Sequence, residues 1–333
     1  MANLKNSDRL VINELLDTGV FAADALRLNV DRQAVVAELK LPSTKRRLNS
    51  YLKNLIGTVP RNYQQNLLLM LGSQQMDAFS VHVLLATLKA VINEPSLQNG
   101  GDDRVVEVNR IVRQVASVVR EADERDIVRE IKALFVDRLG LFTADAPAGN
   151  SQAEGFANDM WDVNPNFTQV ARCLVDEIKA QNTAPDGLEP LQQLNRALLT
   201  HAYLSPKATP HSWTLLQTHK EEAAAQWEEL GRYRLECGQD YALLLDTRRH
   251  QSESRPYIVA MAVAQSLGVG IPEVDLPARI RLLTRQLFGD TSVQVSTIKL
   301  ALLDGHLAEL KDGYVVPTPI VRRYKVTVED DHD

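Results

Sequence analysis

The sequence predicts a mainly helical protein with short β-hairpins, and two observations lead to this fold class. Of the 333 residues, 44% are apolar but only 5% are aromatic. The apolar content comes mostly from Leu, Ala and Val, and the aliphatic character of this mix favours helices over sheets. Apolar residues also recur at helical spacing through most of the chain, which indicates helices with one buried face.

A chain of this length usually forms more than one domain, and changes in pattern suggest where the boundaries fall. A small, polar, unpatterned stretch predicts a linker at residues 143–166. The predicted domains are therefore a helical domain at 1–142, a segment of helices with a β-hairpin at 167–254, a C-terminal domain at 255–328 and an acidic tail at 329–333. No internal repeat is evident.

Helical spacing assigns most of the chain before residue 230. The first predicted helix is capped by Ser7 and carries Leu10, Val11, Leu15 and Leu16 on one side. The others are 31–39, 42–55, 62–71, 77–92, a long helix from 102 or 103 to 139, and then 168–180, 191–204 and 213–230. The period changes at 232–237 and 241–246. These two short segments, separated by a Gly-Gln-Asp turn, predict a β-hairpin.

The last quarter of the chain has the most informative order of elements. Pro256 suits the first turn of one helix, and Asp275 suits the N-cap of a second through 278–287. A third helix is expected from 292 or 293 to 310, with a weak point at Gly305.

Gly313 then predicts the turn of a hairpin, with arms at 314–317 and 320–326. Three helices closed by a two-stranded ribbon are the order of a winged helix-turn-helix. We therefore predict a winged-helix domain at residues 255–328.

In helix-turn-helix proteins the second helix of the motif enters the major groove of DNA. The whole chain has a net charge of −6, so nucleic-acid contact would have to come from local basic patches. The candidate DNA contacts are Gln294, Thr297 and Lys299 on the third helix, Lys311, Arg322, Arg323 and Lys325 around the wing, and a second basic cluster of Lys45, Arg46, Arg47 and Lys53. The few base-reading side chains on the third helix favour a protein-binding winged helix over non-specific or sequence-specific DNA contact.

Apolar side chains at the end of the predicted linker are candidate partner-docking residues. Met160, Trp161 and Phe167 lie among acidic and amide residues. They either anchor the linker on a neighbouring domain or dock a partner protein.

Enzyme motifs are missing from the sequence. No glycine-rich phosphate loop follows a predicted strand, and neither the seven histidines nor Cys173 and Cys237 have metal-ligand spacing. We therefore predict no catalytic residue, metal site or cofactor. The N-terminus lacks the apolar core of a signal peptide, and no apolar run reaches the ~20 residues of a membrane span. We expect a cytoplasmic protein that could associate with the nucleoid.

Residues 198–326 resemble a known family in their order of elements. A helix with Trp213 and Trp227 is followed by the hairpin RYRLECGQDYALLLD, three helices and the wing LKDGYVVPTPIVRRYKV. This order resembles the winged-helix accessory subunits of bacterial condensin-like (SMC-type) complexes, of the MukE or kite type, and related proteins of plasmid- or phage-defence operons. The resemblance covers about two fifths of the chain and is one of pattern, without a diagnostic motif.

The resemblance implies a non-enzymatic subunit that dimerises through winged helices, binds a kleisin-like or SMC-like protein partner and touches DNA. We accordingly expect an interaction or scaffold subunit of a DNA-associated complex. The long helical N-terminal part departs from the compact pattern of that family, which leaves open a kleisin-like bridging chain. Two further hypotheses are a homodimeric DNA-binding regulator or replication factor and an enzyme of unfamiliar type.

Overall fold

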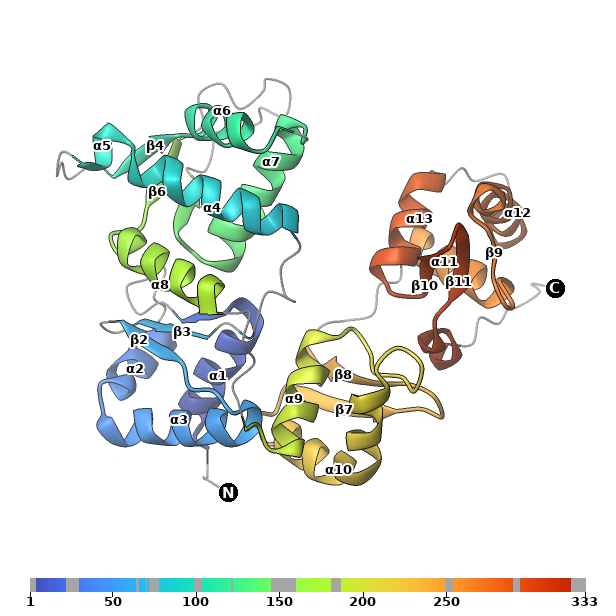
Figure 1. The fold of residues 1–333 in the computed structure, drawn as a ribbon, viewed down its shortest axis with the longest axis horizontal. Helices are drawn as coiled ribbons and strands as arrows, with labels where there is room; N and C mark the ends of the chain where they lie inside the picture. Colours follow the sequence, from blue (N-terminus) through green and yellow to red (C-terminus); the bar gives the residue numbers. More distant parts are fainter. Residues whose placement is uncertain are drawn as a thin grey trace. The chain divides into compact units, whose positions relative to one another are not determined.

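The chain is mainly helical with small antiparallel sheets, as its composition predicts (Figure 1). It divides into two compact units, residues 1–192 and 193–333. The computed structural model describes residues 4–21, 30–63, 66–69, 71, 78–98, 104–120, 122–144, 160–180, 187–248, 254–289 and 294–324.

The first unit begins with an N-terminal module that places a short strand between its first and second helices. Its elements are α1 (Asn6–Thr18), β1 (Val20–Phe21), α2 (Val30–Leu39), α3 (Pro42–Ile56), β2 (Arg61–Tyr63) and β3 (Asn66–Leu68). The antiparallel sheet has the order β1-β3-β2, so the first strand pairs with the last.

A second module in the same unit follows the same order. Its elements are α4 (Ala78–Ile92), α5 (Pro95–Gln98), β4 (Val105–Glu107), α6 (Val108–Val118), α7 (Glu124–Ile131), which continues as the π-helix η2 (Lys132–Arg138), β5 (Phe142–Ala144) and β6 (Met160–Val163). The sheet order is β4-β6-β5, and the first strand again pairs with the last. Helix α8 (Phe167–Ala180) comes next.

The second unit starts with an abbreviated version of this pattern. Helices α9 (Pro190–Thr200, which begins just before the boundary) and α10 (Pro210–Glu228) precede a hairpin of β7 (Tyr233–Cys237) and β8 (Ala242–Asp246). The hairpin lies where the sequence predicts it. A single residue, Leu204, takes the place of the first strand by bridging to Ala242.

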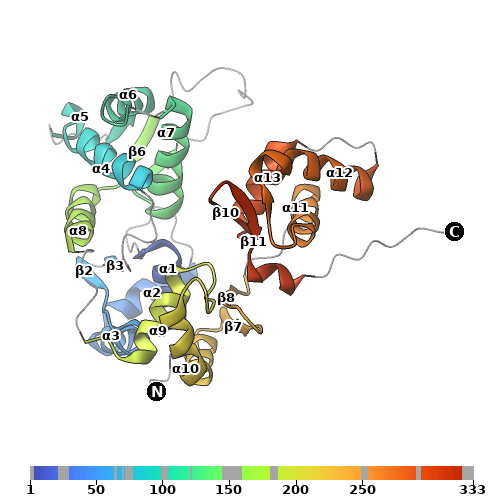
Figure 2. The same cartoon turned by 45° about the vertical axis from the view of Figure 1, so that its right-hand side comes forward.

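The C-terminal module has three helices and a ribbon, as its sequence predicts. Its elements are α11 (Arg255–Ser266), β9 (Ile271–Pro272), η3 (Glu273–Asp275), α12 (Leu276–Phe288), α13 (Val295–Asp304), β10 (Ala308–Lys311), β11 (Tyr314–Pro317) and η4 (Pro319–Arg323). The sheet order β10-β11-β9 again pairs the first strand with the last. Helices α11 and α13 lie side by side in both views (Figures 1 and 2).

One topology therefore recurs in the N-terminal, second and C-terminal modules. It consists of a helix, a short strand, two further helices and a hairpin whose last strand bonds to the first strand. The first strand is buried at Val20 in the N-terminal module and at Val106 in the second, and in the C-terminal module the half-buried Ile271 of β9 pairs with the buried Val315 of β11. In each module the strand that follows the first helix is therefore hydrogen-bonded to the last strand of the hairpin.

Two predicted helices are wrong. Of the predicted helix 62–71, residues 62–63 belong to β2 and residues 66–68 to β3. Leu67, Leu68 and Leu69 are all buried, and a short continuous apolar run does not distinguish a strand from a helix. The long helix predicted from residue 102 or 103 to 139 is also divided. Its start lies outside the described residues, and the remainder forms β4, α6, α7 and η2, with Asp123 capping α7 through the Arg125 N–H.

The predicted linker at 143–166 is also corrected. Its ends belong to β5 and β6, which pair in the sheet of the second module, and residues 145–159 lie outside the described residues. The boundary between compact units falls at 192 instead. In the sequence this polar segment lies between two strands of one sheet instead of between two domains.

The C-terminal hairpin turns at Asp312 and Gly313 as predicted, but its arms are β10 and β11. The second predicted arm, 320–326, begins as the 3₁₀ helix η4, and residues 325–333, including the acidic tail, lie outside the described residues. Helix α13 ends at Asp304, and Gly305 is its C-cap. A Cβ at Gly305 would lie 2.6 Å from the Ala301 carbonyl oxygen, so this position requires glycine.

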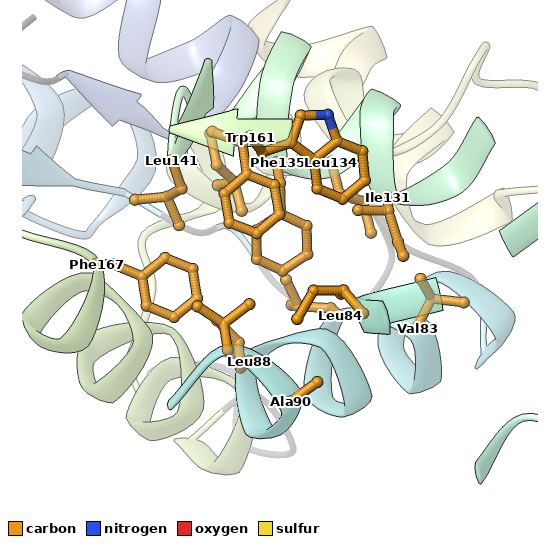
Figure 3. Close-up of a cluster of buried hydrophobic side chains, with 14 of the residues drawn as sticks. Val83, Leu84, Leu88, Ala90, Ile131, Leu134, Phe135, Leu141, Trp161 and Phe167 are labelled. Carbon is orange, nitrogen blue, oxygen red and sulfur yellow. The ribbon is translucent and has the colours of Figure 1, made fainter. Parts of the chain in front are cut away.

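The core of the second module is an aromatic stack (Figure 3). The ring of Phe142 lies 4.9 Å from Phe135, 5.0 Å from Trp161 and 5.8 Å from Phe167, measured between centroids. Trp161 and Phe167 are each 1% exposed. Their prediction as partner-docking residues is therefore wrong, because β6 alternates between faces and turns Trp161 inward, while Met160 stays 40% exposed.

We predict that Trp161→Ala lowers the free energy of unfolding by about 3–5 kcal/mol, because it removes the largest ring of the stack and leaves a cavity. Met160→Ala, on the neighbouring exposed position, is the matched control and should change stability by about 0.5 kcal/mol or less. Thermal unfolding of both full-length variants measures the difference. Equal losses in the two variants would show that the stack does not support the module.

Candidate nucleic-acid interface

Helix α3 is held in the N-terminal module by one buried face. Leu48, Leu52 and Leu55 are at most 1% exposed, and their spacing places them on one side of the helix. Only Lys40 and Leu41 separate α3 from α2, so a short turn joins the two helices.

The C-terminal end of α3 is set by Gly57. Its backbone has φ of +71° and donates its N–H to the Lys53 carbonyl oxygen at 2.9 Å. Glycine adopts this left-handed conformation at little cost. The conformation therefore requires glycine, and a Cβ would also have to displace the end of the Leu188 side chain.

An ion pair connects α3 to α1. The Arg47 guanidinium donates to the Asp8 carboxylate through Nε–Oδ2 at 2.9 Å and Nη2–Oδ1 at 3.1 Å. Asp8 is fully buried, and its Oδ2 also accepts the Lys5 N–H at 2.9 Å. The hydrogen bond to Asp8 raises the pKa of Arg47 above its ordinary value. Arg47 of the predicted basic cluster is therefore half-buried and pairs with the Asp8 carboxylate instead of facing a ligand.

The opposite side of α3 is polar and basic. Arg46, Asn49, Ser50 and Lys53 are exposed, and their spacing of three, one and three residues places them on one face of the helix. Lys45 is half-buried beside them. We call these four exposed residues the α3 face. In the described part of the chain, no hydrogen bond or ion pair engages the side chains of Arg46, Asn49 or Lys53.

The charge around α3 also differs from that of the rest of the molecule. Residues 1–69 contain ten Lys and Arg against six Asp and Glu, a net charge of +4, and α3 itself has no acidic residue. Residues 78–163 contain nine against fourteen, a net charge of −5. The N-terminal module therefore attracts a polyanion more strongly than the second module does.

The cations predicted as DNA contacts in the C-terminal module mostly have carboxylate partners. Lys299 Nζ lies 2.6 Å from Glu273 Oε1. Arg322 Nη1 lies 2.6 Å from Asp240 Oδ2. The third pair joins Arg323 Nε to Glu236 Oε1, also at 2.6 Å. A phosphate would have to displace a carboxylate at each position, and Arg322 and Arg323 instead tie η4 to the β7–β8 hairpin.

Three of the other predicted contacts of this module are exposed. Gln294 at the N-cap of α13 and Thr297 within it are uncharged, and Lys311 lies at the end of β10, while Lys325 lies outside the described residues. Leu300, on α13, is 60% exposed. Lys299 is the one cation within α13, so the outward side of this helix is neutral and partly apolar.

Exposed aliphatic side chains continue beside β9. Val269 is 96% exposed and Val274 is 84% exposed. Both flank the edge strand of the C-terminal sheet. A contiguous patch of such side chains marks a surface that contacts another protein, whereas single exposed ones are common on any protein.

Sequence reasoning identified the cations of α3 but not Asn49 and Ser50. The signal was present, because both residues follow Arg46 at helical spacing within the predicted helix 42–55. This spacing becomes informative only once the structure shows that α3 is the third helix of a module with the same topology as the C-terminal one.

In the described ranges, no group of three or more His, Cys, Asp or Glu side chains is placed to hold a metal ion. No helix in these ranges has both the length and the apolar content needed to cross a membrane. Comparison of the chain with protein-family models, curated proteins and solved structures found no match.

We predict that Arg47→Ala destabilises the protein by about 2–3 kcal/mol, since it leaves the buried Asp8 carboxylate without its counter-charge. This is less than the about 3–5 kcal/mol lost on breaking a fully buried pair, because 24% of the Arg47 side chain is exposed. The control Arg46→Ala, one residue away on the exposed side, should cost about 0.5 kcal/mol or less. Thermal unfolding measures both, and a similar loss in the two variants would contradict the assigned orientation of α3.

Proposed function

We propose that this chain is a non-enzymatic interaction subunit of a DNA-associated complex, built from winged-helix modules. The recurring order of helix, strand, two helices and ribbon supports the winged-helix assignment of the C-terminal module and extends it to the N-terminal and second modules. The observation that carries the proposal is the α3 face. It lies on the third helix of its module, the position that enters the major groove in helix-turn-helix proteins.

The two ends of the chain suit different partners. The N-terminal module offers exposed cations on α3, which suit phosphates. The C-terminal module combines paired cations with the exposed Val269, Val274 and Leu300, which suits a protein. In the proposed complex the chain touches DNA through its N-terminal module and holds a protein subunit through its C-terminal module.

We propose that the assembly is a condensin-like complex. In it the chain would act as an accessory subunit of the MukE or kite type, and its partner would be a kleisin-like or SMC-like protein. Its net charge of −6 limits DNA affinity and makes the partner necessary for stable association. The short α2–α3 turn favours one second candidate, a homodimeric DNA-binding regulator. Such a regulator would bind a palindrome tightly without a partner.

We predict weak, salt-sensitive binding of the full-length chain to duplex DNA. Replacing both Arg46 and Lys53 by alanine should lower the slope of log affinity against log salt by about 2, because each lost phosphate contact contributes about 0.9. Fluorescence anisotropy with a labelled duplex between about 50 and 200 mM salt measures this slope.

The matched control replaces Lys299 and Arg322 by alanine. Both are ion-paired, so the salt slope should stay unchanged. Absence of any salt-dependent binding by the unmodified chain would remove the DNA part of the proposal.

We also predict that the chain co-purifies in fixed stoichiometry with the products of neighbouring genes when the native operon is expressed. Val269→Asp with Val274→Asp should weaken this complex at least tenfold without unfolding the chain, since both side chains are almost fully exposed. Val118→Asp, at a 60% exposed position on α6, is the control and should leave the complex intact. Recovery of an isolated monomer would count against the hypothesis of an interaction subunit. Tight binding of a homodimer to a palindrome would favour the hypothesis of a DNA-binding regulator.

A further inference from the structure

We infer that the α3 face reads base edges in the major groove of duplex DNA, in addition to any contact with phosphates. This inference rests on the proposed function, because it names the ligand of the same helix more closely. It depends on which side chains α3 exposes and on how firmly the helix is held.

The side chains of the α3 face are those that distinguish bases. Arginine donates two hydrogen bonds to O6 and N7 of guanine, and asparagine pairs with N6 and N7 of adenine. Arg46 and Asn49 can fill these two roles. Ser50 lies between them and Lys53 on the same face and is able to bond to several bases. Lys53 ends the row with a cation that suits guanine or a phosphate.

The length of the α3 face matches a short DNA target. From Arg46 to Lys53 the helix advances seven residues, or about 10 Å at about 1.5 Å per residue. Successive base pairs are about 3.4 Å apart along a strand, so the face spans about three base pairs. A single α-helix fits the major groove. The expected target is therefore a run of about three base pairs that includes guanine and adenine.

Base reading requires a helix that cannot rotate. The Asp8–Arg47 ion pair, the buried leucines and the Gly57 terminus fix α3 about its axis. A preorganised helix directs its side chains with the precision that bidentate contacts need. Within α13 itself, the exposed Ser296, Thr297 and Leu300 are not bidentate, and Gln294, exposed at the N-cap, is the side chain there that could pair with adenine.

The test is a selection of duplexes from a random pool with the full-length chain, followed by anisotropy at fixed salt with the enriched duplex and a scrambled one. The unmodified chain should prefer the enriched duplex at least tenfold. Asn49→Ala should lower affinity for the enriched duplex by about 5- to 150-fold, the range expected for one bidentate contact. Its affinity for the scrambled duplex and its salt slope should not change. Asn49→Gln should recover part of the preference, because glutamine also pairs with adenine.

Asn54→Ala is the matched control. Asn54 is exposed on the same helix, but it lies one position beyond Lys53 and away from the centre of the face, so its loss should change affinity less than twofold. Thermal unfolding of both variants checks that each remains folded.

Three other outcomes would overturn base reading, and one of them would also overturn DNA binding. Salt-dependent binding of all duplexes with equal affinity would overturn base reading and leave the proposed function standing. Equal weakening of enriched and scrambled duplexes by Asn49→Ala would also overturn it. Failure of the unmodified chain to bind any duplex would overturn the DNA part of the proposed function as well.

Discussion

The ion pair between Asp8 and Arg47 determines which side of α3 meets solvent. A buried carboxylate without a counter-charge is unfavourable by several kcal/mol, so Arg47 has to face α1 once Asp8 is enclosed. Neighbouring residues on a helix point about 100° apart. Arg46 therefore turns outward, and with it the residues three, four and seven positions further on. One internal pair thus defines the outward chemistry of the helix, in agreement with the burial of Leu48, Leu52 and Leu55.

A second constraint is the pairing of the first strand of each module with the last. Two or three residues are too short to form a sheet alone, but they connect the chain after the first helix to the ribbon and so complete the hydrogen bonding of the ribbon edge. In the C-terminal module the cations contribute to the same task. Arg322 and Arg323 join η4 to the β7–β8 hairpin, so residues that look available in the sequence make contacts within the unit.

The sequence predicts helices well where apolar spacing is regular and the ends have clear signals. Helices α3, α4, α8 and α12 lie within three residues of their predicted bounds, and the β7–β8 hairpin lies where the period changes. Prediction fails where short apolar runs are ambiguous, as in β2 and β3, and where a polar segment is taken for a linker although strands stand at both of its ends. The repeated topology is invisible because strands of two or three residues leave no periodic pattern.

The sequence by itself determined the helical class, the hairpin turns at Gly238 and Gly313, and the concentration of basic residues near Arg46, because these depend on local spacing and on residue type. Only the tertiary structure decided which basic residues remain exposed. Whether a cation binds a carboxylate or faces water depends on which distant segment packs beside it, as Asp8 does for Arg47 and Asp240 for Arg322. For the same reason Trp161 lies in a core, although its neighbours in sequence suggest a surface.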